Sequence, residues 1–177
     1  MSDIWTTDGP DPREATGPTR GEKACVVDYL RAYRLTLQMK CEGLDAEQLA
    51  RRSVPPSSMS LLGLVRHLAK VEHTWARQCL EGQNLPRLYV TDDEPDADFD
   101  GAVADDAVVA EAWEAWHREV SHAEQVVERL DDLGALVSWH GDGIEVRDVL
   151  VHLVEEYARH VGHADLLREC VDGRTGQ

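Results

Sequence analysis

Four long stretches of the sequence repeat apolar residues at intervals of three and four, and this pattern constrains the fold more than any other feature. Such spacing places the apolar side chains on one face of a helix. Glycines, prolines and acidic turn residues separate the stretches. The predicted helices span about residues 22–43, 59–82, 105–130 and 146–170. Amphipathic helices bury their apolar faces against one another, so the sequence predicts an all-α fold, a four-helix bundle with long connections.

A single domain is expected from the size of the chain. Its 177 residues, 42% of them hydrophobic, are enough to form one core. Prolines and glycines among charged residues predict an extended N-terminal arm over residues 1–21. The bundle domain then occupies residues 22–177, with a connection at residues 136–144 that has room for a short extended piece.

The long connection at residues 83–104 is strongly acidic and is predicted to be a solvated loop. Asp96, Asp98 and Asp100 match the first half of a calcium-binding EF-hand loop. The match fails at its twelfth position, where Ala107 replaces the bidentate glutamate that such a loop needs. No calcium site is therefore predicted here.

The charge of the chain excludes several classes of partner. Its formal charge of −16, from 34 acidic and 18 basic residues, argues against binding to nucleic acid or to an anionic membrane surface. No stretch approaches the roughly 18 apolar residues of a spanning helix, and the N-terminus lacks the features of a signal peptide. The four cysteines are far apart, which is typical of reduced thiols. We therefore expect a cytoplasmic protein that acts on a small molecule.

Metal-ligating residue types gather on one face of the last predicted helix. At about 100° per residue, His152, Glu156, His160 and His163 fall within an arc of about 80°. A polar face that meets water is the alternative interpretation. His67 lies among the apolar residues of the second helix, where a buried histidine bonded to a neighbouring carboxylate or carbonyl is the commoner explanation. If the two helices face each other, His67 can meet Glu156 and His160.

Three segments carry a resemblance to a known group of proteins. The segments are Lys40–Leu44, Ser60–Leu68 and Glu155–Glu169. They resemble the DinB-like four-helix bundle superfamily, which includes bacillithiol transferases and mycothiol-dependent maleylpyruvate isomerases, and most of all its functionally unassigned mini-circle proteins. The resemblance implies a divalent metal held by His67, Glu156 and His160. Glu156 in the first position of the last-helix pair resembles the His-Glu-His set of the isomerase branch.

The leading hypothesis is a metal-dependent enzyme of the S-transferase or isomerase type. Three protein ligands leave an open position on the ion, which we expect to be zinc, with nickel and iron as alternatives. The resemblance implies a low-molecular-weight thiol such as mycothiol as cosubstrate. His163, His152 and Glu155 are predicted to orient a ligand or to line the pocket. No protein side chain is assigned a catalytic role, because the ion itself would activate the thiol.

Two other functions use the same residues. One is a non-catalytic, metal-stabilised binding or assembly module, a homodimer that associates through Trp113 and Trp116. The other is a metal-dependent hydrolase in which Glu155 or a nearby histidine acts as base. The sequence does not separate the hydrolase from the thiol transferase, since both need the same open metal site.

Overall fold

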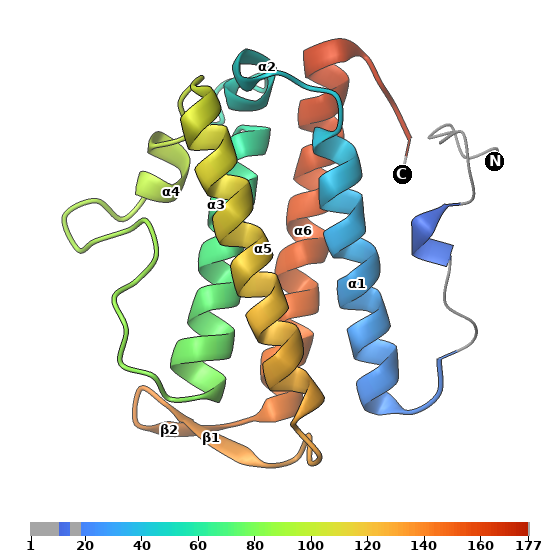
Figure 1. Cartoon of the computed structure of the whole chain (residues 1–177), viewed down its shortest axis with the longest axis vertical. Helices are drawn as coiled ribbons and strands as arrows, with labels where there is room; N and C mark the ends of the chain where they lie inside the picture. The colour runs from blue at the N-terminus through green and yellow to red at the C-terminus, as the bar shows by residue number, and fades with distance from the viewer. Residues whose placement is uncertain (1–10, 15–18, 177) are drawn as a thin grey trace.

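Four long helices packed side by side form the body of the protein. The computed structural model describes residues 11–14 and 19–176. Figure 1 shows the four helices, with α3 continued by the π-helical segment η2. Their bounds are α1 Glu22–Cys41, α3 Leu61–Glu72, η2 His73–Leu80, α5 Asp106–Glu128 and α6 Val146–Asp172. The predicted all-α four-helix bundle is confirmed, and each long helix begins within about two residues of the expected position.

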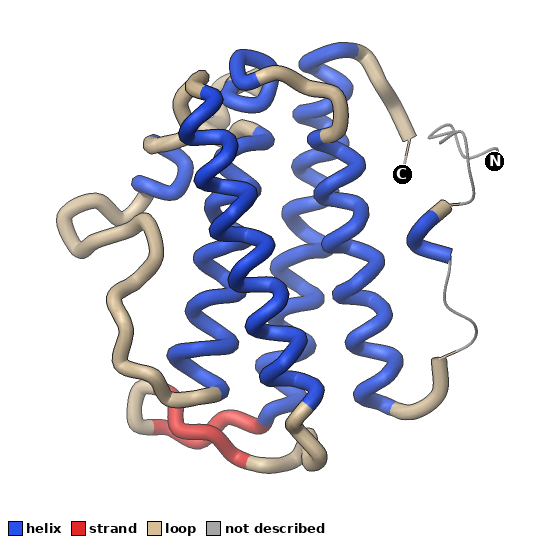
Figure 2. The backbone as a smooth tube through the Cα atoms, viewed as in Figure 1, coloured by secondary structure: helices blue, strands red, loops and turns tan. Residues whose placement is uncertain are grey.

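Short elements occupy the ends and the outside of the bundle. Figure 2 shows a small two-stranded hairpin closing one end, which is the only β structure in the described ranges. The short elements are η1 Pro12–Glu14, α2 Ala46–Ala50, α4 Ala97–Asp100, β1 Leu136–Trp139 and β2 Asp142–Glu145. At the hairpin turn His140 and Gly141 have φ angles of 51° and 93°. Two successive positive φ angles are the geometry that a two-residue hairpin turn requires.

The predicted N-terminal arm lies only partly in the described ranges, since residues 1–10 and 15–18 fall outside them. Its described part is not fully extended, because Pro12–Glu14 form the 3-10 turn η1. The guanidinium of Arg31 in α1 donates to the backbone carbonyls of Pro12 and Arg13 at 3.0 and 2.6 Å. This segment of the arm is therefore attached to the first helix.

Polar side chains cap the N-termini of α3 and α5. The hydroxyl of Ser60 accepts a hydrogen bond from the backbone N–H of Gly63 at 3.1 Å and caps α3. Asp105 caps α5 in the same way, because its carboxylate accepts from the N–H of Ala107 at 2.7 Å. Both caps satisfy amide groups that a helix N-terminus otherwise leaves unpaired.

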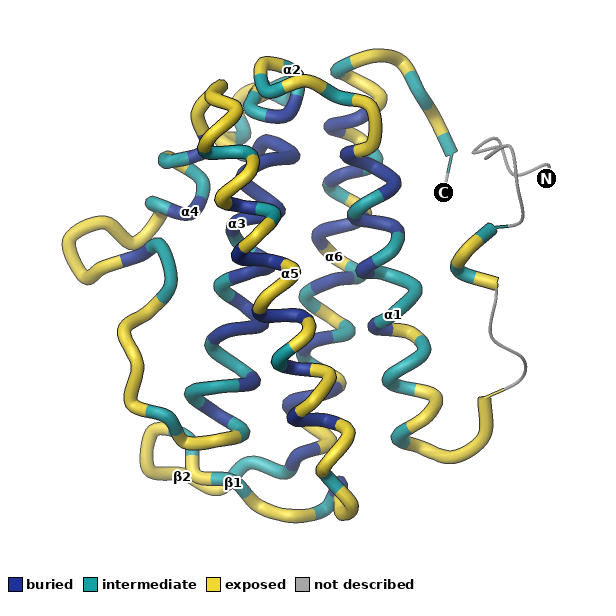
Figure 3. The backbone as a smooth tube through the Cα atoms, viewed as in Figure 1, coloured by how far each residue is buried: buried dark blue, intermediate teal, exposed yellow. Residues whose placement is uncertain are grey.

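The buried residues of the four helices face one another inside the bundle (Figure 3), and a polar network joins all four helices there. Arg34 of α1 donates two hydrogen bonds, of 2.8 and 2.9 Å, to the carboxylate of Glu72 in α3. Tyr157 of α6 donates to the same carboxylate at 2.8 Å, and Trp116 of α5 donates to the Tyr157 hydroxyl at 3.0 Å. Pairing a buried charge in this way avoids the high cost of leaving it unpaired.

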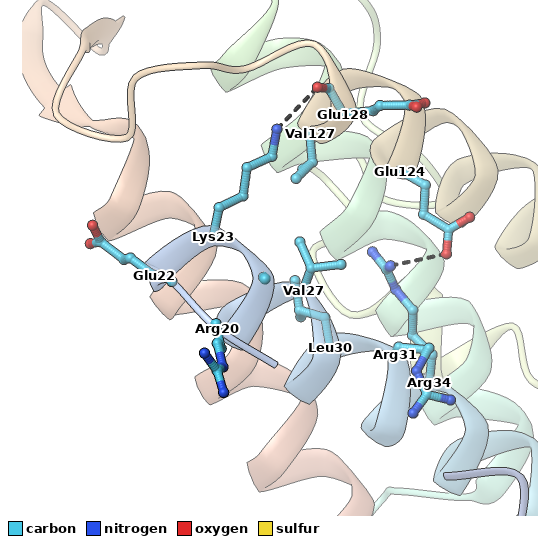
Figure 4. Close-up of a pocket in the computed structure, with 12 residues that line it drawn as sticks. Arg20, Glu22, Lys23, Val27, Leu30, Arg31, Arg34, Glu124, Val127 and Glu128 are labelled. Carbon is cyan, nitrogen blue, oxygen red and sulfur yellow. Dashed lines mark hydrogen bonds and ion pairs between the residues drawn. The ribbon is translucent and has the colours of Figure 1, made fainter. Parts of the chain in front are cut away.

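A cavity of about 690 Å³ lies between α1 and α5. Its apolar lining includes Val27, Leu30 and Val127, which face one another in Figure 4. Polar bridges between the helices flank it: Lys23 donates to the carbonyl of Glu128 at 3.0 Å, and Arg34 pairs with Glu124 at 3.4 Å. None of the residues expected to bind metal lines this cavity.

Candidate metal centre

Two facing helices bring His67, Glu156 and His160 together. His67 lies in the middle of α3, and Glu156 and His160 are one turn apart in the middle of α6. One donor atom from each residue lies within 4.8 Å of the other two, the one such group found among the described residues. The sequence-based prediction that these three side chains converge therefore agrees with the structure.

The distances between the donor atoms suit a single divalent ion. Oε2 of Glu156 is 3.7 Å from Nε2 of His67 and 3.4 Å from Nε2 of His160. Zinc binds nitrogen and oxygen ligands at about 2.0–2.2 Å, so tetrahedral ligands are separated by roughly 3.4 Å. Closing the set around an ion thus requires only small side-chain adjustments.

An unsatisfied ring nitrogen marks the centre of this group. Nε2 of His67 is buried and has no hydrogen-bond partner, although most buried polar atoms have one. The other ring nitrogen, Nδ1, is bonded to a carboxylate; when the imidazole is neutral and Nδ1 carries the proton, Nε2 is the acceptor atom. An acceptor atom that faces a second imidazole and a carboxylate is suited to bind a metal ion.

The partner of His67 is Asp98, which the sequence placed in a solvated acidic loop. That prediction was wrong for this residue: Asp98 is only 1% exposed, and its Oδ2 lies 2.9 Å from Nδ1 of His67. The ammonium of Lys70 donates to the same oxygen. Burial opposes the charge of Asp98, but the hydrogen bonds from His67 and Lys70 outweigh it and lower the pKa of Asp98 to about 2. An ionised carboxylate at Nδ1 fixes the tautomer and orientation of a metal-binding histidine.

The short helix α4 holds Asp98 against α3. The guanidinium of Arg66 donates to the backbone carbonyls of Ala97 and Asp98 at 3.2 and 3.0 Å. The ring of Phe99 stacks on His67 with 5.0 Å between centroids. Phe99 fits there because Gly63 has no side chain: a Cβ on Gly63 would lie 2.8 Å from Cδ1 of Phe99. These contacts attach the end of a long connection to the candidate ligand.

The electrostatics favour a charged carboxylate at the centre. The neighbouring imidazoles of His160 and His67, 3.4 and 3.7 Å from its Oε2, lower the pKa of Glu156 far below its ordinary value. Burial lowers the pKa of His67, but the hydrogen bond with Asp98 and the nearby carboxylate of Glu156 outweigh burial, so the net pKa is raised. Two negative partners around His67 provide the charge that a bound cation would neutralise.

A family model described as Mycothiol-S-transferase matches residues 25–173. The chain belongs to the mycothiol-S-transferase family. The match spans all four long helices and the three residues of the candidate centre, and it confirms the resemblance to the DinB-like bundles. No curated protein and no solved structure shows a significant match. None of the described helices is both long and apolar enough to cross a membrane.

The other predicted residues of this mycothiol-S-transferase family member lie around the ligand group. Nε2 of His152 is 3.3 Å from Oε1 of Glu156, and the Nδ1 atoms of His163 and His160 are 3.4 Å apart. Glu155 has a side chain that is 60% exposed and accepts from Arg159 at 3.2 Å. His152 and His163 thus contact candidate ligands directly, whereas Glu155 points to the surface.

The tryptophan pair on α5 is unsuited to the assembly role considered above. Trp116 is 2% exposed and belongs to the core network of this family member. Trp113 is half-buried and packs edge-on against Trp116 at 5.5 Å. The hypothesis of a homodimer through both indoles is therefore wrong for Trp116, because an interface residue has to be accessible in the free chain.

Proposed function

We propose that the protein is a metal-dependent transferase that moves the thiol of mycothiol onto an electrophilic small molecule. The observation that carries the proposal is the group of three donor atoms from two helices, including the unsatisfied Nε2 of His67. Membership in the mycothiol-S-transferase family supports mycothiol as the thiol. Zinc is the metal proposed, because two imidazoles and one carboxylate are common zinc ligands in enzymes.

The chain's own residues would hold and present the ion. Asp98 accepts at Nδ1 of His67 and so directs the free Nε2 lone pair inward. His160 and Glu156 complete the set from the opposite helix. A divalent ion bound there would supply the positive charge that lowers the pKa of a bound thiol toward neutrality.

The transfer itself is a substitution at carbon. The thiolate sulfur forms a bond to the electrophilic carbon, and the leaving group departs with the electrons of the broken bond. The thiol proton passes to solvent, which can reach the site because the side chains of His67 and Glu156 are 17% and 21% exposed. No protein nucleophile is needed, so none of the four cysteines is assigned a role.

The test measures mycothiol consumption by the zinc-loaded protein in the presence of a reactive alkyl halide. Glu156→Ala and His160→Ala should abolish zinc binding and zinc-dependent consumption while helical content is retained. His117→Ala is the matched control, because His117 is an exposed histidine on α5. Consumption that persists in both ligand variants would refute the proposal. A protein that binds zinc but consumes no thiol would instead be the binding module.

A further inference from the structure

Three rings from three separate elements form a row that ends at the candidate metal centre. Trp139 of β1 packs on Trp75 of η2 with 5.3 Å between ring centroids. Trp75 packs in turn on His152 of α6 at 4.5 Å. His152 is the residue whose Nε2 lies 3.3 Å from Glu156. The row therefore runs from the hairpin to a carboxylate of the proposed ligand set.

The row is not a buried packing cluster. Trp75, Trp139 and His152 are all partly exposed, whereas Trp116 in the core is 2% exposed and has its N–H bonded. Two adjacent indoles that remain accessible expose apolar surface to water, which is unfavourable and which tighter packing would avoid. Exposed aromatic surface beside a polar site is characteristic of ligand-binding surfaces.

The backbone that carries Trp75 is itself unusual. It lies in η2, an eight-residue π-helical continuation of the helix that carries His67. π-Helical turns are rare and occur frequently at functional sites, because the wider turn changes the direction of the side chains beyond it. Here the changed segment places an indole against His152 and the hairpin.

We infer that Trp75 and Trp139 bind the electrophilic substrate, and that this substrate is a planar aromatic molecule without negative charge. The inference rests on the proposed transferase function and names its substrate class. Electron-rich indole rings attract flat, electron-poor rings through stacking and edge contacts. Carboxylates adjoin the row, since Asp142 pairs with Trp139 across the hairpin and Glu155 lies 3.7 Å from His152. Their charge disfavours an anionic substrate.

Binding can be tested without any thiol. The zinc-loaded, ¹⁵N-labelled protein is titrated with nitrobenzene, which is planar and unreactive, and separately with nitrocyclohexane, which is not aromatic. Nitrobenzene should shift the indole N–H resonances of Trp75 and Trp139 and leave those of Trp113 and Trp116 in place. Equal shifts with nitrocyclohexane, or shifts at neither indole of the row, would overturn the inference.

Matched variants separate stacking from simple apolar contact. Trp139→Leu and Trp75→Leu keep an apolar side chain and should weaken nitrobenzene binding roughly twofold to tenfold each. Trp113→Leu should leave binding unchanged, and zinc content measured for each protein shows that the centre is intact. Wild-type affinity in both folded row variants would contradict the inference.

Kinetics then distinguish this inference from the function on which it rests. With mycothiol, the row variants should lower kcat/KM for benzyl bromide more than for cyclohexylmethyl bromide, each relative to the wild type. Equal losses for the two halides would count against an aromatic substrate. Absence of transfer to either halide, together with nitrobenzene shifts at the row, would refute the transferase function and leave an aromatic-binding site.

Discussion

Replacing Asp98 by asparagine should weaken zinc binding without removing any ligand. The carboxylate is fully buried and bonded to Nδ1 of His67 and to Lys70. The amide of asparagine fills the same space but carries no charge, so the imidazole becomes a poorer donor to the ion. Loss of such an outer partner typically lowers metal affinity by about 10- to 100-fold, which corresponds to about 1.4 to 2.8 kcal/mol.

The measurement is competition for zinc with a chromophoric chelator, using the Asp98→Asn protein beside Asp100→Asn. Asp100 lies on the same short helix, but its side chain is 66% exposed and pairs with a half-exposed guanidinium, that of Arg52, at 2.8 Å. Its substitution should leave the zinc affinity unchanged. If folded Asp98→Asn binds zinc within twofold of the wild type, then the buried carboxylate does not support the ligand and the reasoning fails.

Three further predictions concern stability. Glu72→Gln removes the buried carboxylate that pairs with the Arg34 guanidinium and leaves the exposed, more distant Glu124 as a charged partner, so it should lower the free energy of unfolding in urea by about 3 kcal/mol; an unchanged midpoint would contradict this. Gly63→Ala should displace Phe99 and cost about 1–3 kcal/mol in the same assay, with Gly162→Ala as a control whose added Cβ meets nothing. Burial raises the pKa of Glu119, but hydrogen bonds from two arginines outweigh burial and lower the pKa below the ordinary 4.5. The ionised carboxylate therefore stabilises the folded protein above about pH 4.5, and this contribution is lost on acidification. The difference in free energy of unfolding between the wild type and Glu119→Gln should therefore shrink below about pH 4.5. A difference that stays constant with pH would refute this prediction.

Periodic patterns made the bundle and two of the ligands predictable. Residues four apart on a helix share a face whatever the rest of the chain does, so Glu156 and His160 could be paired from their spacing alone. Spacing alone could not predict that His67 joins these two residues, because the helix that faces it is determined by packing between helices. The resemblance of its segment to the DinB-like bundles supplied that step.

Asp98 could not be found in the same way. It lies in the short helix α4, at the end of a long irregular connection, and no periodicity relates a residue beyond such a connection to the face of α3. Its acidic neighbours, Asp96 and Asp100, suggested a calcium loop or a solvated segment. The role of Trp139 was hidden for the same reason, since it depends on how the hairpin folds back over η2.

The network of Arg34, Glu72, Trp116 and Tyr157 takes one group from each long helix. A substitution at any of the four removes a hydrogen-bond partner from a buried polar neighbour. We therefore expect these four positions to change together in related sequences. Related chains should either retain all four residues or have exchanged them together for an apolar set, and intermediate combinations should be rare.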